Sequence, residues 1–247
     1  MDSLNVKSLI LLCLFLSTSL LASISDFIYP KSSAPSFSNY GTVGLIQAPS
    51  ARFHPAGSIA FSFTDVDPYL RGSIVAYPFS WFEASYQYID INNALYSDIA
   101  AFSGGQTYKD KSFSAKFRLL SERNFLPQVA LGVRDLAGTG VFSSEYIVAS
   151  KKIRNVDLSL GLGWGMMSEN SVRNPFISIS NRFKSREINS QNSSGGEINF
   201  DSLFGGPAGI FGGAEIIIPN SKGLRVKVCL LYTSPSPRDA HESRMPS

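Results

Sequence analysis

Val156-Asp-Leu-Ser-Leu-Gly-Leu-Gly-Trp-Gly165 carries the clearest secondary-structure signal in this chain. Valine, leucine and tryptophan occupy its even positions, whereas aspartate, serine and glycine occupy its odd positions. Successive side chains of a β-strand point to opposite faces of the sheet. The segment therefore predicts a strand with one apolar face and one face of polar or small residues.

The same two-residue period recurs along the chain after residue 38. It is clear over 58–64, 112–119 and 128–134, and less regular over 68–77, 81–91, 144–152, 175–184, 196–204, 208–218 and 223–228. Turn-forming glycine, proline, asparagine and aspartate residues separate these runs. No segment after residue 25 shows a long apolar stripe of helical period. Short strands divided by turns predict an all-β antiparallel meander.

Composition narrows the kinds of β-protein that fit. Charged residues make up 17% of the chain and mean hydropathy is +0.04, which is too apolar for a disordered protein. The alternating strands of a membrane β-barrel average to such a hydropathy, and several runs approach the roughly 9–11 residues that a tilted transmembrane strand needs. Tight connections, as at 65–68 and 152–155, alternate with long ones, as at 92–110 and 184–196.

Aromatic residues near the predicted strand ends favour the same architecture, because outer-membrane barrels carry aromatic girdles at both interfaces. The residues concerned are Tyr69, Tyr77, Trp81, Phe82, Tyr86, Tyr88, Phe113, Phe117, Trp164, Phe176 and Phe183. We therefore predict an antiparallel meander that forms part of a transmembrane, outer-membrane β-barrel. A soluble β-sandwich is the alternative, because its strands alternate in the same way.

The N-terminus is typical of an export signal. Lys7 supplies a short positive region, residues 8–21 form an apolar core, and small residues follow at 22, 23 and 25. We expect residues 1–25 to be a cleaved signal peptide, followed by a Ser/Pro-rich segment over 26–38. A lipoprotein signal would need a cysteine at the end of the apolar core, and Cys13 lies inside it. The sequence therefore predicts cleavage without lipidation.

The C-terminus differs in kind from the rest of the chain. Cys229-Leu-Leu-Tyr-Thr-Ser-Pro-Ser-Pro-Arg-Asp239 resembles the translation of a sequencing adapter, and an unstructured Pro/Ser tail is the alternative that its composition allows. We expect 229–247 to be a non-native tail, 39–228 to be a partial barrel domain, and the chain to be a truncated fragment with an unpaired last strand near 223–228.

Three stretches resemble the YjbH-like family of exopolysaccharide-associated outer-membrane proteins of Gram-negative bacteria. They are Asn39-Tyr-Gly-Thr-Val-Gly-Leu-Ile-Gln-Ala-Pro-Ser-Ala-Arg52 with Gly57, the segment from Leu131 to Lys151, and Leu203-Phe-Gly-Gly-Pro-Ala-Gly-Ile-Phe-Gly-Gly-Ala-Glu215. The resemblance implies a location in the outer membrane and a role in exopolysaccharide production or export. Outer-membrane lipid, exopolysaccharide and periplasmic or outer-membrane export proteins would then be its partners.

No catalytic, metal or cofactor site is predicted. Cysteines occur only at 13 and 229, so thiolate chemistry is not expected in between. His54 precedes Pro55 in a turn, with no nucleophile-elbow pattern nearby. Asp65 and Asp67 could bind calcium weakly, but aspartate before proline is ordinary turn chemistry. A net charge of +3 without long basic runs gives no case for nucleic-acid binding.

Polar residues opposite the apolar strand faces are the candidates for function. If the apolar faces meet lipid, the polar side chains point into the barrel lumen. The residues concerned are Glu83, Lys116, Arg118, Arg134 and Asp157. Mixed charges of this kind form either an internal salt-bridge network or a polar path for a saccharide.

The sequence therefore leaves three functions open. The leading hypothesis is a non-catalytic outer-membrane β-barrel protein of exopolysaccharide production or export. The first alternative is an outer-membrane lipid or saccharide hydrolase, which would have to use His54. The second is a soluble periplasmic β-sandwich that acts as a binding module.

Overall fold

The structure, a computed structural model, describes residues 34–97, 99–138, 140, 142–168, 172–186, 200–218 and 224–231. The predicted signal peptide and the part of the predicted non-native tail after residue 231 lie outside these ranges. Among the described residues, no helix has the length and apolar character needed to cross a membrane.

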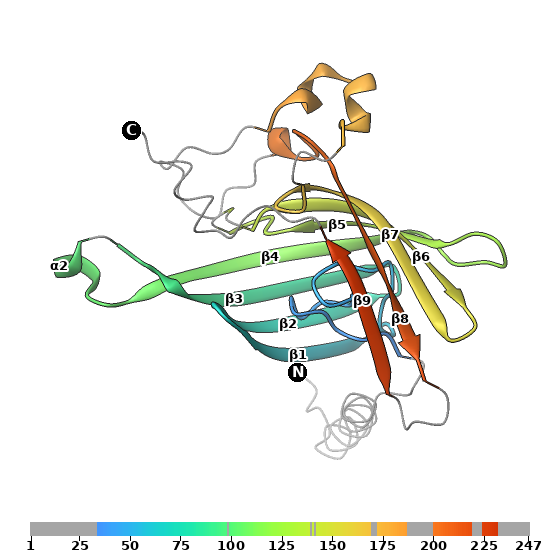
Figure 1. Ribbon diagram of the computed structural model, residues 1–247, viewed down its shortest axis with the longest axis horizontal. Helices are drawn as coiled ribbons and strands as arrows, with labels where there is room; N and C mark the ends of the chain where they lie inside the picture. The colour runs from blue at the N-terminus through green and yellow to red at the C-terminus, as the bar shows by residue number, and fades with distance from the viewer. Residues whose placement is uncertain are drawn as a thin grey trace, which may run out of the picture.

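The strands form one antiparallel sheet in which each strand pairs with its neighbours in sequence. This order confirms the predicted all-β meander, and Figure 1 shows that the sheet curls into an open half-barrel. One short helix, α2 (Ala100–Ser103), lies in the connection between β3 and β4. The strands are β1 (Ser58–Val66), β2 (Tyr69–Phe79), β3 (Phe82–Leu95), β4 (Thr107–Leu120), β5 (Gln128–Arg134), β6 (Ser144–Ile153), β7 (Val156–Gly165), β8 (Gly209–Ile217) and β9 (Arg225–Leu231).

The two faces of the sheet differ in the way that the two-residue period predicts. Along β3, alternate residues from Glu83 to Ile91 are buried, and the residues between them are partly exposed. The opposite, outer face carries large apolar side chains in contact with solvent, such as Phe61 on β1 and Leu160 on β7, each 64% exposed. The polar residues therefore gather on one face, which we call the inner face, and most large exposed apolar residues of the strands on the other.

A non-strand segment over residues 36–54, the inner segment, covers the inner face. Figure 1 shows it in blue within the curve of the sheet. Its Val43, Leu45 and Phe53 belong to the main apolar core, together with inner-face residues such as Tyr77 and Tyr146. The core therefore lies between the sheet and the inner segment, and the described strands do not form the two stacked sheets of a sandwich.

The prediction of a strand over 175–184 is wrong. The residues form two 3-10 helices, η1 (Pro175–Ser178) and η2 (Asn181–Lys184). A third, η3 (Phe200–Ser202), followed by a turn at 203–204, lies in the described part of the predicted strand 196–204. Asn174 explains this, because its side chain accepts a hydrogen bond from Phe176 N and caps η1. Its amide nitrogen also donates to the carbonyls of Phe183, Phe204 and Gly206.

This connection between β7 and β8 packs on the outer face at one end of the sheet. It buries Trp164 completely, with the ring of Phe176 stacked on the indole at 5.2 Å. Arg186 makes a bidentate ion pair with Glu145, which is also fully buried. Trp164 is therefore covered by protein rather than placed in an exposed girdle.

Two further expectations about strand ends need correction. Tyr77 lies in the inner core, not on the outer face. The tight turn at 67–68 lies at the same end of the sheet as the long connections after β3, β5 and β7. The connections at the two ends therefore differ less in length than was predicted from the alternation of tight and long connections. The last strand runs from Arg225 to Leu231 and therefore extends into the segment predicted to be non-native.

Candidate functional site

The structure places all five predicted polar residues on the inner face, where the inner segment meets the sheet. Glu83 on β3 and Lys116 on β4 are direct cross-strand partners. The Lys116 Nζ lies 2.9 Å from the Glu83 Oε2, and the two side chains are 1% and 3% exposed. Two opposite charges buried together offset most of the cost of their desolvation, so each depends on the other.

Lys116 also connects the sheet to the inner segment. Its Nζ donates a hydrogen bond of 2.9 Å to the Arg52 carbonyl oxygen and lies 4.6 Å from the centre of the Phe53 ring. The Arg118 guanidinium lies 4.9 Å from the centre of the same ring. Two cations on β4 therefore hold Phe53 by cation–π contact.

Arg134 on β5 contacts another aromatic residue of the inner segment. Its guanidinium lies 4.2 Å from the centre of the Tyr40 ring, and Arg71 on β2 approaches the same ring at 4.9 Å. Within the described residues neither arginine forms an ion pair with a carboxylate. Tyr40 therefore lies against two arginine side chains that are almost completely buried.

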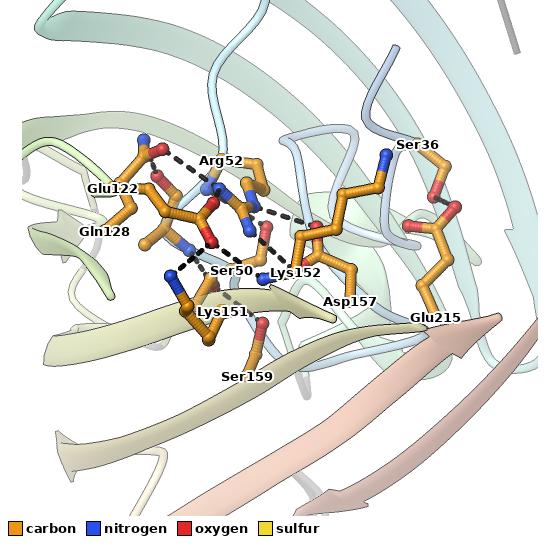
Figure 2. Close-up of polar contacts among 12 residues, drawn as sticks. Ser36, Ser50, Arg52, Glu122, Gln128, Lys151, Lys152, Asp157, Ser159 and Glu215 are labelled. Carbon is orange, nitrogen blue, oxygen red and sulfur yellow. Dashed lines mark hydrogen bonds and ion pairs between the residues drawn. The ribbon is translucent and has the colours of Figure 1, made fainter. Parts of the chain in front are cut away.

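Asp157 on β7 belongs to a charged network centred on Arg52. Figure 2 shows Arg52 facing Asp157 on one side and Glu122 on the other. Arg52 donates two hydrogen bonds of 2.8 Å to the two oxygens of Asp157 and one of 2.6 Å to Glu122. Glu122 also accepts from the Lys152 backbone N–H and pairs with Lys151 at 3.2 Å.

The network fixes the charge states of its members. Burial opposes the charge on Arg52, but hydrogen bonds to Asp157 and Glu122, and their negative charge, raise the pKa of the guanidinium. Burial likewise opposes the charge on Glu122, but hydrogen bonds from Lys152, Arg52 and Lys151 lower the pKa of its carboxyl group. Both groups are therefore ionised at neutral pH, and their attraction fastens the inner segment to the sheet.

A cavity of about 240 Å³ adjoins this network at the end of the sheet where β6 turns into β7. Its lining includes Arg118, Lys152 and the ring of Phe53. Glu215 also lines it, and this carboxylate is already engaged by Arg225 at 2.7 Å and by the Ser36 hydroxyl at 2.9 Å. The cavity is large enough for a small polar ligand.

A second acidic position lies at the opposite end of the inner face. Asp135 follows β5 directly and accepts a hydrogen bond of 3.1 Å from Phe142 N. Burial, and then the negative charge of Asp110, raise the pKa of the Asp135 carboxyl group to about 7. This carboxyl group therefore titrates close to neutral pH.

The residues considered for catalysis or metal binding do not assemble a site in the described part of the chain. The His54 imidazole stacks on Phe37 at 4.8 Å, and no serine hydroxyl of the described residues is hydrogen-bonded to it. Burial, followed by the charges of Lys116 and Arg225, lowers the pKa of His54, which makes it neutral at pH 7. The described residues contain no group of three or more histidine, cysteine, aspartate or glutamate side chains that could hold a metal ion.

Reasoning from sequence missed the inner segment and its partners. Arg71 could have been found, because it shares the two-residue period of β2 with the buried Ser73 and Val75. Arg52 could not have been found, because nothing local pairs it with Asp157, 105 positions further along the chain.

Comparisons with known proteins agree with this architecture. Residues 36–230 match the family model described as YjbH, exopolysaccharide biosynthesis protein YbjH. A curated relative, the uncharacterized lipoprotein YjbH of Escherichia coli (strain K12), is 43% identical over 192 residues, which is 77% of this chain. The chain spans 27% of that relative's length. No solved structure matches this chain. The match covers the inner segment and the strands of the described residues, apart from the last residue of β9. The chain belongs to the YjbH family, which is linked to exopolysaccharide biosynthesis.

Proposed function

We propose that this chain contributes a β-barrel portion to an outer-membrane protein that acts, without catalysis, in exopolysaccharide production or export. The observation that carries the proposal is the contrast between the two faces of the sheet. The Glu83–Lys116 and Arg52–Asp157 ion pairs lie on the inner face, whereas the outer face presents exposed apolar side chains on strands from β1 to β9. An outward apolar surface around a polar interior is the arrangement that a lipid bilayer stabilises.

The outer face is too apolar to be left in water. Phe61 and Phe63 on β1 are 64% and 70% exposed, and similar residues follow on β7 and β9. Each square ångström of apolar surface removed from water contributes about 25 cal/mol, so contact with lipid chains would stabilise this face strongly. Exposed apolar patches of this extent mark an interaction surface rather than an ordinary soluble exterior.

An aromatic cluster at the turn between β2 and β3 supports the same orientation. Phe79 and Trp81 stack with their ring centres 5.3 Å apart, and Phe82 stacks on Phe117 at 5.0 Å. Phe79 and Trp81 are about half exposed. Aromatic rings at strand ends are typical of the boundary between lipid and water.

The membrane part of the proposal is tested by placing a charge at two depths. We expect Phe61→Arg, in the middle of β1, to cost about 2–4 kcal/mol on insertion, and Phe125→Arg, in the loop before β5, about 0–1 kcal/mol. The measurement is the yield of heat-modifiable protein in outer-membrane fractions of cells expressing the full-length protein. Equal yields of the two variants, or recovery of the parent protein in a salt-washed soluble fraction, would count against a barrel.

The polysaccharide part rests on the family to which the chain belongs. We expect deletion of the gene in its native host to lower the amount of secreted polymer, and re-expression to restore it. Unchanged polymer under inducing conditions would contradict the role. Partner proteins of the export machinery would be sought by cross-linking in the same strains.

We infer a non-catalytic role because the half-buried His54 stacks on Phe37 instead of meeting a nucleophile. A His54→Gln variant removes the imidazole, and the glutamine side chain fills part of the space that the ring occupies. We expect it to leave polymer secretion unchanged, provided that the outer-membrane level of the protein is unchanged. Loss of secretion at a normal protein level would instead favour the hydrolase alternative.

A further inference from the structure

We propose that the cavity beside Arg52 binds an acidic sugar through Arg118 and Lys152. The inference rests on the proposed function for the choice of a saccharide, and on the charges around the cavity for the choice of an acidic one. The cavity has a volume of about 240 Å³, and cations and an aromatic residue line it.

The carboxylates near the cavity are already engaged by other partners. Both oxygens of Asp157 accept from Arg52 at 2.8 Å. Glu215 accepts from Arg225 and from the Ser36 hydroxyl, and Glu122 from Arg52 and Lys151. Each of these anions therefore already has at least one cationic partner.

Two cations of the lining have no carboxylate partner among the described residues. The Arg118 side chain packs over Phe53, and its Nε is buried without a hydrogen-bond partner. Lys152 uses its backbone N–H for Glu122, and its Nζ makes no ion pair in the described part of the chain. In Figure 2 the Lys152 side chain extends between the Arg52–Asp157 pair and the Ser36–Glu215 pair. An anion that enters the cavity therefore meets positive charge that the protein does not neutralise.

The form of the cavity favours a carboxylate on a ring over a free inorganic anion. A guanidinium group donates two parallel hydrogen bonds to a carboxylate, which a sugar acid supplies. Phe53 adds an apolar wall at the edge of the site, against which the C–H face of a pyranose can pack. Lys152 is exposed, so a ligand can reach it from solvent. Uronic acid residues of a polymer chain match this combination.

Calorimetric titration of the purified full-length protein in detergent micelles tests the inference. The probes are a tetrameric galacturonate, a neutral maltotetraose and inorganic phosphate. We expect the oligogalacturonate to bind more tightly than either other probe. Replacing Arg118 or Lys152 by methionine should weaken its binding at least about tenfold, since a hydrogen bond to a charged group is lost. Arg118→Lys should restore part of the affinity.

Arg123→Met is the matched control, because Arg123 is exposed in the neighbouring loop and does not line the cavity. It should bind the oligogalacturonate as the parent does. Equal binding of maltotetraose, equal weakening by Arg123→Met, tighter binding of phosphate, or no binding by the parent protein would each overturn the inference. Heat-modifiable migration of every variant shows whether it is folded.

The outcome is separate from that of the proposed function. If the protein is in the outer membrane and its deletion lowers polymer secretion, but the oligogalacturonate does not bind, only the acidic-sugar site is refuted. If the protein is recovered as a soluble species, or if deletion leaves polymer unchanged, the proposed function fails whatever the titration shows.

Discussion

Replacement of Glu83 by glutamine should destabilise the protein more than any comparable change of a surface carboxylate. The change removes the negative partner of Lys116, whose Nζ lies 2.9 Å away and whose side chain is only 1% exposed. Breaking a buried ion pair by removal of one partner costs about 3–5 kcal/mol, because the remaining charge is left buried. Lys116 keeps its hydrogen bond to the Arg52 carbonyl, but a neutral acceptor does not compensate a charge.

The assay is urea unfolding of the full-length protein refolded into lipid vesicles, followed by heat-modifiable migration. With an m value of about 3 kcal/mol/M, a loss of 3–5 kcal/mol lowers the urea midpoint by roughly 1–1.7 M. Asp90→Asn is the matched control, since Asp90 and its partner Lys109 are 23% and 30% exposed. We expect this change to cost less than about 1 kcal/mol.

A second substitution separates buried charge from general damage. Glu83→Gln combined with Lys116→Met removes both charges, so the penalty for an unpaired ammonium disappears. The Arg52 carbonyl then loses its donor at a cost of about 1–3 kcal/mol. The double variant should therefore be more stable than Glu83→Gln alone. The reasoning is refuted if it is less stable, or if Glu83→Gln and Asp90→Asn shift the midpoint equally.

Three further outcomes follow from individual side chains. Gly132→Ala should lower stability by about 1–3 kcal/mol in the same urea assay, because the added Cβ would lie too close to a tyrosine ring. Gly72→Ala should leave stability unchanged, because the Cβ added there would meet open space. Because folding raises the pKa of Asp135 to about 7, the contribution of its protonated carboxyl group to stability is lost as pH rises from about 4 to 7. Asp135→Asn should therefore make the free energy of unfolding depend less on pH over this range, and an unchanged slope would contradict this. Asn174→Ala removes donors to three carbonyls and should make Trp164 more accessible to acrylamide quenching in a background without the other tryptophan; unchanged quenching would contradict this.

The strands were predictable because the residue pattern within each strand shows which of its faces is buried. In β7 the two-residue period alone distinguishes Leu158 and Leu160, which are exposed on the outer face, from the buried Ser159 on the inner face. Turn residues then set the ends, as Asn155 does between β6 and β7. Both signals are local, and antiparallel neighbours need no information from distant parts of the chain.

The 3-10 segment after β7 was mispredicted for the opposite reason. Its apolar residues alternate loosely, but they pack with Trp164 and Phe204 in a separate aromatic cluster. Asn174 fixes this cluster through carbonyls that are up to 32 positions away. A period read over a few residues cannot report partners at that separation, so tertiary packing overrode the strand pattern.

The inner segment explains why the inner face is rich in hydrogen-bond donors. Backbone of irregular conformation that is buried must find partners for its carbonyl groups. Inner-face side chains supply them, by donating to the carbonyls of residues 37, 39, 40, 44, 51 and 52. The donors are Lys227, Thr64, Ser73, Gln87, Gln128 and Lys116.

The cations that lie between the sheet and the inner segment differ in whether they bind a backbone carbonyl or a carboxylate. Lys116 and Lys227 serve the backbone of the inner segment, and Arg52 serves the carboxylates of β7 and of the loop before β5. Within the described residues Arg118 and Lys152 do neither, although Arg118 packs over Phe53. Arg71 and Arg134 also lack a carboxylate partner there, but they lie against Tyr40, whereas Arg118 and Lys152 line the cavity. Arg118 and Lys152 share the cavity lining with two further cations, Arg52 and Arg225, and like charges repel one another. Their presence beside an aromatic wall is therefore better explained by a ligand that brings its own negative charge.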